Sequence, residues 1–129
     1  MEVSLTYAKV VDRDAFQRQG AVVRPGTDSG IKVPGEPPAT AAPFLVLRTW
    51  KHADGAFTER WRLVDPHGRT VREPVEREVL PPDPELADEI LDQLIEYDHE
   101  GYQLVLEVDG REIARADLPV QVDSDGSTT

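Results

Sequence analysis

Few side chains in this sequence have the type and spacing that enzyme chemistry requires. The absence of cysteine excludes a thiol nucleophile and any zinc or iron–sulfur site built on cysteine. None of the serines occurs in the G-x-S-x-G pattern that exposes and activates a hydroxyl. A phosphate-binding G-x-x-x-x-G-K-[ST] pattern is also missing. We therefore expect no enzyme activity and no cofactor.

Histidines and carboxylates are the remaining candidates for a metal site. All three histidines lie beside turns, and His52 and His67 fall on consecutive turns, at opposite ends of an antiparallel fold. Exposed turn histidines are the simpler interpretation. Asp54, Asp98 and Glu100 could supply oxygen ligands for calcium or a carboxylate pair for catalysis. Since no calcium-loop pattern is present, we expect no metal.

A run of carboxylates without lysine or arginine occupies residues 83–100. The formal net charge of −11 repels phosphate backbones and anionic lipid, so we expect neither nucleic acid nor a membrane as a partner. The run has a sharper interpretation as a nucleic-acid mimic that inhibits a DNA- or RNA-binding protein. Its candidate contact residues are Asp88, Glu89, Asp92 and Glu96. The simpler interpretation is a solvated acidic surface.

Residues 25–43 are rich in proline and glycine, which predicts a long loop without a regular element. The functional interpretation is a protein-binding loop, with Ile31 and Val33 as contact residues. The alternative is a mobile excursion with a short edge strand at 31–33. Our leading hypothesis is a non-catalytic protein-binding or adaptor module that uses this loop and the sheet edge near Pro119, because edges accept additional strands.

The elements that must position these residues are mostly strands. Alternation of apolar and polar residues marks them, and turn patterns at Asp54-Gly55, D-P-H-G and Asp109-Gly110 separate them. The expected strands cover 2–11, 21–24, 44–50, 57–65, 70–80, 102–108, 111–116 and 118–122. Closely spaced strands and turns of this kind favour an antiparallel sandwich.

Residues 84–96 are predicted to form one short acidic helix. Asp83 can cap its start, Pro84 suits its first position, and apolar residues follow at helical spacing. The competing interpretation is a strand over 89–97, because apolar residues also alternate there.

Three arginines accompany two tryptophans on the central strands. We expect Trp50 and Trp61 in the core, and Arg48, Arg60 and Arg62 on the strand faces around them. Arg60 and Arg62 share the face opposite Trp61, where cross-strand ion pairs are the simpler interpretation and a phosphate-binding patch is the alternative. The expected partners are glutamates of the following strand: Glu73, Glu76 and Glu78.

The stretch G-Y-Q-L-V-L-E-V-D-G-R-E-I-A-R-A-D-L-P-V, residues 101–120, resembles the closing hairpin of immunoglobulin-like sandwiches. With the opening M-E-V-S-L and the central L-V-D-P-H-G, the layout resembles a family of short, uncharacterised bacterial β-sandwich proteins, a domain of unknown function. The resemblance implies an all-β, antiparallel, immunoglobulin-like sandwich and supplies no functional residues. The chain departs from that pattern at 25–43 and 84–96.

We expect a single domain over residues 1–123, followed by a flexible tail over 124–129. The sequence begins without the basic and apolar regions of a signal peptide, and it holds no apolar run long enough to span a bilayer. We therefore expect a cytoplasmic protein.

Overall fold

A computed structural model describes residues 4–18, 20, 30–51, 55–80, 85–97 and 101–122. The strands are β1 (Ser4–Asp12), β2 (Ile31–Val33), β3 (Ala39–Thr40), β4 (Phe44–Lys51), β5 (Phe57–Val64), β6 (Val75–Val79), β7 (Glu85–Ile90), β8 (Leu94–Ile95), β9 (Gln103–Val108), β10 (Arg111–Asp117) and β11 (Val120–Val122). A single short helix, α1 (Arg13–Arg18), accompanies them in these ranges. This content confirms the all-β prediction. Within the described ranges, no helix has the length and apolar character needed to cross a membrane.

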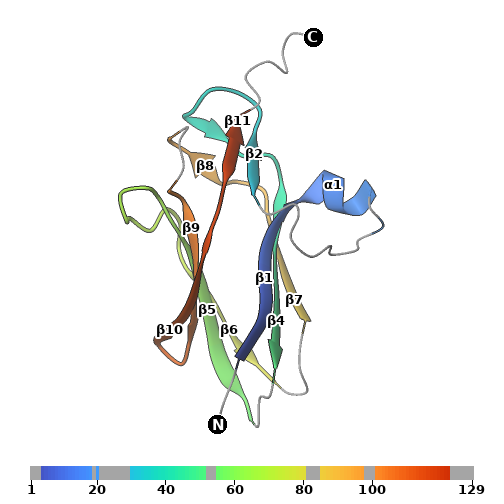
Figure 1. Ribbon diagram of the computed structural model, residues 1–129, viewed down its shortest axis with the longest axis vertical. Coiled ribbons are helices and arrows are strands. Elements are labelled where there is room, and N and C mark those ends of the chain that lie inside the picture. The colour runs from blue at the N-terminus through green and yellow to red at the C-terminus, as the bar shows by residue number, and fades with distance from the viewer. Residues whose placement is uncertain are drawn as a thin grey trace.

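Two antiparallel sheets face each other and make up most of the fold (Figure 1). One has the strand order β1-β4-β7 and the other β10-β9-β5-β6. Two short ribbons lie together at one end of the sheets: β3 pairs with β8 in antiparallel fashion, and β11 pairs with β2 in parallel. The predicted strand at 21–24 and the tail at 124–129 fall outside the described residues.

The core lies between the two main sheets and follows the alternation of the central strands. Trp50 in β4 and Trp61 in β5 are completely buried, as predicted, among inward residues such as Phe44 and Leu63. Burial of each large apolar side chain contributes about 1.5–3 kcal/mol. The same alternation also turns one charged residue of each strand inward, Arg48 in β4 and Glu59 in β5.

The predicted helix at 84–96 is wrong, because residues 85–90 form β7 and residues 94–95 form β8. β7 pairs with β4 over its whole length, from Glu85 opposite Thr49 to Ile90 opposite Phe44. This ladder satisfies the backbone groups of β7 and lets Ile90 reach the core, which outweighs the local helix-start signals. The strand alternative was closer, although it placed the start at residue 89. The helix that does form, α1, is capped by the Asp12 carboxylate, which accepts the Ala15 N–H at 3.0 Å.

The described part of the proline-rich segment, residues 30–43, contains two short strands, β2 and β3, joined by bends. The short strand predicted at 31–33 is confirmed. β2 pairs with β11, and the side chains of Ile31 and Val33 are both buried in the core. The prediction that these two side chains contact a partner is therefore corrected, because buried side chains offer no surface to a partner.

Two predicted turns are confirmed. In D-P-H-G, the Gly68 N–H donates to the Asp65 carbonyl at 2.9 Å. At the β9–β10 connection, Asp109 and Gly110 have φ of 49° and 84°. Positive φ at both positions is the requirement of a type I′ hairpin turn, which explains the Asp-Gly pair.

Tyr102 fastens the segment before β9 to the segment after β8. Its hydroxyl accepts the backbone N–H groups of Glu96 at 3.1 Å and Tyr97 at 3.3 Å. Burial raises the pKa of the Tyr102 hydroxyl, and the two backbone hydrogen bonds only partly oppose this effect. The side chain therefore works as a buried, neutral acceptor.

We expect Tyr102→Phe to lower the free energy of unfolding by about 1–3 kcal/mol, because two backbone donors lose their acceptor. Urea denaturation would measure the loss. Tyr97→Phe is the control, since the Tyr97 hydroxyl accepts from Arg69 at an exposed site and its removal should matter less. Equal losses in the two variants would show that the hydrogen bonds between the Tyr102 hydroxyl and the backbone have no special role.

Candidate functional site

Four charged side chains form a cluster between the main sheets, which we call the inter-sheet network: Arg48, Glu59, Arg77 and Asp88. Arg48 in β4 and Asp88 in β7 come from one sheet, whereas Glu59 in β5 and Arg77 in β6 come from the other. The side chains of Arg48 and Glu59 are 0% exposed. The formal charges of the four groups cancel, which is the condition under which charges are tolerated in a protein interior.

Each arginine of the network contacts both carboxylates. Arg48 binds Glu59 through two hydrogen bonds of 2.9 and 2.5 Å and approaches Asp88 at 3.0 Å. Arg77 forms an ion pair with Asp88 and lies 4.0 Å from Glu59. The Arg48–Glu59 and Arg77–Asp88 contacts run from one sheet to the other, so they tie the sheets together.

The two buried tryptophans complete the network. The Trp50 indole N–H donates to Glu59 at 2.6 Å, and the Trp61 indole N–H donates to Asp88 at 2.8 Å. Each carboxylate thus accepts from one indole and faces both guanidinium groups. Such an arrangement holds the packing of the core and presents no free acid or base to solvent.

Glu59 was not among the predicted site residues, although the sequence pattern places it on the inward face of β5. In F-T-E-R-W-R-L-V, residues 57–64, the apolar positions Phe57, Trp61 and Leu63 define the inward face, and Glu59 falls on the same face. A carboxylate in that position requires a buried cation. Arg48 occupies the equivalent inward position of β4, between Val46 and Trp50.

The four acidic residues predicted to contact a partner do not form a continuous line of unpaired carboxylates. Asp88 belongs to the inter-sheet network, while Glu89 pairs with Arg13 at 3.1 Å and Asp92 pairs with Arg72 at 3.2 Å. In β7 the burial alternates, with Asp88 half-buried and Glu89 exposed, so these two neighbours point to opposite faces. Glu96 is exposed.

The ion pairs of the outer sheet face differ from those predicted. Arg60 and Arg62 pair with Glu107 of β9, at 3.9 and 3.4 Å, and not with the glutamates of the following strand. β5 lies between β6 and β9, so both arginines have a choice of neighbours. The carboxylate of Glu107 is mostly buried, and two cations at this position compensate its loss of water.

Asp65 organises the D-P-H-G turn with its side chain. The carboxylate accepts the backbone N–H groups of His67 at 2.8 Å and Arg69 at 2.9 Å. Burial alone would raise the pKa of Asp65, but the hydrogen bonds from Arg69 and His67 outweigh burial and lower this pKa below its usual value. The charged form therefore stabilises the folded state.

This shift predicts a pH dependence. Because the pKa of Asp65 is lower in the folded state, its contribution is complete above pH of about 4, the unfolded pKa, and is lost as the pH falls through the folded pKa. Asp65→Asn removes this titration. We expect the urea midpoint of the wild type to fall more steeply below pH of about 4 than that of the variant. Parallel curves would contradict the assignment.

No metal centre is assembled by the part of the chain that the structure describes, in which no three histidine, aspartate or glutamate side chains group together. His67 packs edge-on against Tyr97, with 4.9 Å between ring centroids. The calcium or catalytic candidates Asp54, Asp98 and Glu100 lie outside the described residues.

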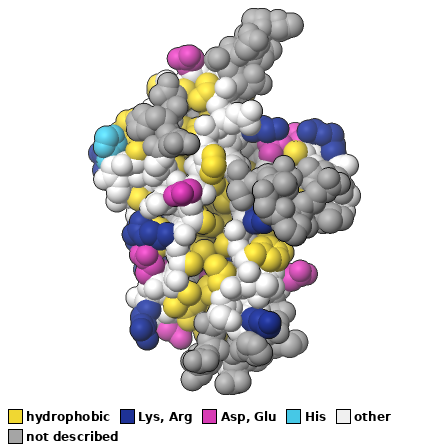
Figure 2. Space-filling view, viewed as in Figure 1, with side chains coloured by type: hydrophobic (Ala, Val, Ile, Leu, Met, Phe, Trp, Pro, Cys, Tyr) yellow, Lys and Arg dark blue, Asp and Glu magenta, His cyan; other side chains and the backbone are white. Residues whose placement is uncertain are grey.

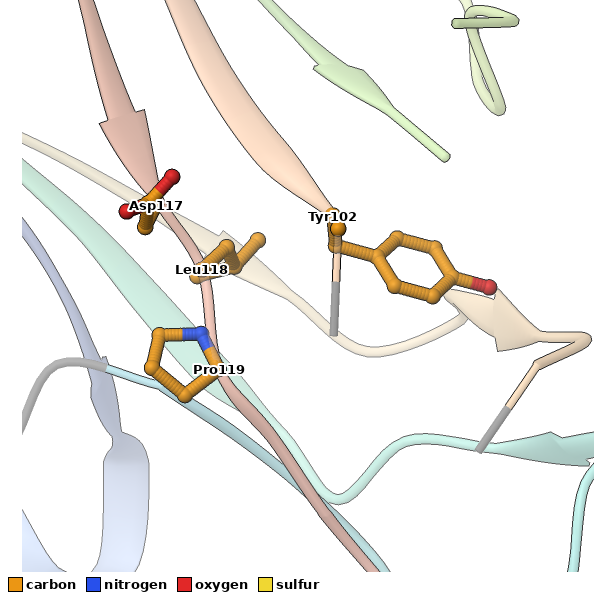
Figure 3. Close-up of a pocket in the computed structure, with 5 residues that line it drawn as sticks. Tyr102, Asp117, Leu118 and Pro119 are labelled. Atoms are coloured by element: carbon orange, nitrogen blue, oxygen red, sulfur yellow. The ribbon is translucent and has the colours of Figure 1, made fainter. Parts of the chain in front are cut away.

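A small depression adjoins the bend between β10 and β11. Gly101, Tyr102, Asp117, Leu118 and Pro119 line it, and its volume is about 240 Å³. Figure 3 shows Leu118 directed toward Tyr102, whose ring points away from Asp117, Leu118 and Pro119. Small-molecule sites usually enclose about 300–1,000 Å³. The depression is therefore small for a metabolite or cofactor.

Two leucines stand out at the end of β7 and in β8. Leu91 is 56% exposed and Leu94 is 49% exposed. We call residues 91–96 the β8 ledge. Between the leucines, Gln93 is buried, its carbonyl accepts the Ala41 N–H at 2.8 Å, and its side-chain amide donates to the Leu94 carbonyl at 2.9 Å. The first bond fixes the ledge to the segment 30–43, and the second orders the backbone of the ledge itself.

The edge strands of the main sheets carry features that oppose the addition of another strand. β1 and β10 each contain a bulge in the pairing with their neighbour. β6 and β7 instead carry the network charges Arg77 and Asp88. Bulges and inward charges are two ways in which proteins protect sheet edges. The strand after Pro119, predicted to be a contact edge, is β11 and pairs with β2.

No protein-family model matches the chain, and no curated protein matches it significantly.

Proposed function

We propose that the protein is a non-catalytic binding module that contacts another protein through the β8 ledge. The observation that carries this proposal is the pair of half-exposed leucines, Leu91 and Leu94, on a backbone held by buried bonds. Three residues of chain span at most about 11 Å, so the two leucines lie close together on the surface. Single exposed apolar residues need no explanation, whereas grouped ones mark contact sites.

The rigidity of the ledge supports a binding role. Within the ledge, Ile95 is fully buried in the core, and Leu94 lies opposite Thr40 in the β3–β8 ribbon. Arg72 adds a hydrogen bond of 3.4 Å to the side chain of Gln93 and an ion pair to Asp92. A surface that is already ordered loses less conformational entropy when a partner binds.

The test compares capture of partners by three forms of the tagged protein. We expect the double variant Leu91→Ser, Leu94→Ser to lose proteins that the wild type retains from a lysate of the source organism. Leu80→Ser is the matched control, because Leu80 is 64% exposed at the end of β6, away from the ledge. Thermal unfolding of all three forms verifies the fold. Unchanged capture by the double variant would overturn the proposal.

The non-catalytic part of the proposal has its own support. The two carboxylates of the inter-sheet network, Glu59 and Asp88, are surrounded by arginine and indole donors. The depression near Tyr102 is small for a substrate. We propose no cofactor, and a cytoplasmic setting without nucleic acid or membrane as partner.

The alternative role as a nucleic-acid mimic receives less support. Such a mimic needs a row of uncompensated negative charge, but Asp88, Glu89 and Asp92 each pair with an arginine. Mimicry would make capture fall steeply with added salt, whereas contacts of the leucines would persist. Capture at two salt concentrations separates the two roles.

An immunoglobulin-like arrangement is part of the proposal. Two facing antiparallel sheets and the closing β9–β10 hairpin support it. The hydroxyl of Tyr102, just before β9, bonds to backbone N–H groups five and six residues upstream. This resembles the tyrosine corner of immunoglobulin-like domains. We likewise propose membership of the family of short bacterial β-sandwich proteins that the sequence resembles.

A further inference from the structure

A second surface lies on the side where β1 and β10, the outer strands of the two sheets, approach each other. We call it the β1–β10 seam. Cα atoms of the two strands come within 8 Å. Ile113 is 43% exposed, and Leu5, Ala8, Ala114 and Ala116 are half-buried against the core. Figure 2 shows hydrophobic side chains running along the middle of this side of the molecule.

β10 carries four charged side chains, two of which pair with each other. Glu112 and Arg115 pair with each other at 2.8 Å and so compensate one another. That leaves Arg111 at the start of the strand and Asp117 at its end, and neither forms an ion pair with any residue that the structure describes. The strand therefore has one uncompensated cation and one uncompensated anion, separated by six residues or about 20 Å.

This pattern is self-complementary. If a second strand of the same sequence lies antiparallel to the first, the cationic end of each faces the anionic end of the other. The middle of each strand, which holds exposed Ile113 and the mutually compensated Glu112–Arg115 pair, then faces the middle of the other. We infer that a second copy of the chain packs on the β1–β10 seam about a two-fold axis. Arg111 of each copy then meets Asp117 of the other, beside the depression lined by Leu118 and Pro119.

A two-fold dimer also agrees with the protected edges. An open strand edge would allow unlimited addition of strands, but β10 carries a bulge that interrupts its pairing. Packing of side chains along the seam uses the same patch on both copies and stops at two. The inference does not depend on the β8 ledge, so either proposal can fail while the other stands.

The test is a charge exchange followed by sedimentation equilibrium over a range of concentrations. Arg111→Asp and Asp117→Arg each place like charges together at two symmetric contacts, and each should weaken the dimer about tenfold or more. The double variant Arg111→Asp, Asp117→Arg restores both attractions, and we expect most of the affinity to return. Arg18→Asp, at the exposed end of α1, is the control with the same change of charge.

A second variant tests the apolar part of the seam. Ile113→Asp should dissociate the dimer, whereas Leu80→Asp should leave it intact, because Leu80 lies at the end of β6. A wild type that is monomeric up to millimolar concentration would overturn the inference. A dimer that is indifferent to Ile113→Asp would also overturn it, as would a charge exchange that fails to restore binding.

Discussion

Replacing Glu59 with leucine is expected to lower the free energy of unfolding by about 3–5 kcal/mol, although leucine is close in volume and more apolar. The loss arises from what remains behind. Arg48 keeps its charge at a position with no exposure and loses both hydrogen bonds to Glu59, and the Trp50 indole loses its acceptor. Leaving a buried cation with too few partners is one of the few mechanisms by which a single substitution lowers the free energy of unfolding by this much.

The matched experiment also replaces Arg48, the cation that loses its Glu59 partner in Glu59→Leu. In Arg48→Met, Glu59→Leu, the buried pair becomes an apolar pair, while Asp88 retains Arg77 and the Trp61 indole. We expect the double variant to be more stable than Glu59→Leu alone, so that the two single losses do not add. Urea denaturation followed by tryptophan fluorescence measures all four forms. Additive losses would show that Arg48 and Glu59 are not energetically coupled.

The surface pair Glu112–Arg115 provides a contrast for the buried network. Its hydrogen bonds with Arg115 lower the pKa of Glu112, yet both side chains remain substantially exposed. Exposed pairs contribute little, because water and salt screen them. Glu112→Leu should therefore change stability far less than Glu59→Leu, although both remove one carboxylate from an arginine.

What could be predicted from the sequence was local. β4 was identified by apolar residues on both faces, whereas alternation in β1, β5 and β9 identified those strands because a strand with one inward face imposes a period of two. Trp50 and Trp61 fell on inward positions for the same reason. Asp109-Gly110 was recognised because few other residue pairs tolerate two positive φ angles.

What could not be predicted depends on partners distant in the sequence. The segment 84–96 has helix-start signals, and only its pairing with β4 makes it a strand. Asp88 turns inward because Arg48 and Arg77 lie there to compensate its charge, one on each sheet. Ile31 was similarly hidden, since β2 becomes a core strand only by pairing with β11, far along the chain.

The β8 ledge escaped prediction for a related reason. In the helical interpretation, Leu91 and Leu94 belong to an apolar stripe that packs on the core. In the structure the chain leaves β7 after Ile90, and Gln93 takes the buried position between the two leucines. A buried glutamine requires partners, and here its backbone and side chain bond to Ala41 and to the ledge itself. The bond to Ala41 is distant in the sequence, and no periodicity reveals it.

Gly101→Ala is expected to lower the free energy of unfolding by an amount on the order of 3 kcal/mol. Gly101 has φ of 123°, which a side chain rarely adopts. A Cβ there would also lie 2.9 Å from the Cβ and 3.1 Å from the Cα of Pro66. Because one of these atoms belongs to the backbone of the D-P-H-G turn, relief requires the turn or the start of β9 to shift, and the Tyr102 corner contact with it.

Two other glycines separate the conformational cost from the steric cost. Gly110 has φ of 84°, and no atom lies within 4 Å of the position that an alanine methyl group would take, so Gly110→Ala should show the conformational part alone, about 1 kcal/mol. Gly35 has neither a positive φ nor a close neighbour, so Gly35→Ala should be nearly neutral. The expected order of losses, by urea denaturation, is Gly101, Gly110, Gly35. If Gly101→Ala costs no more than Gly110→Ala, the approach of Pro66 is not a constraint. The close packing of the D-P-H-G turn against Gly101 then cannot explain why glycine precedes Tyr102.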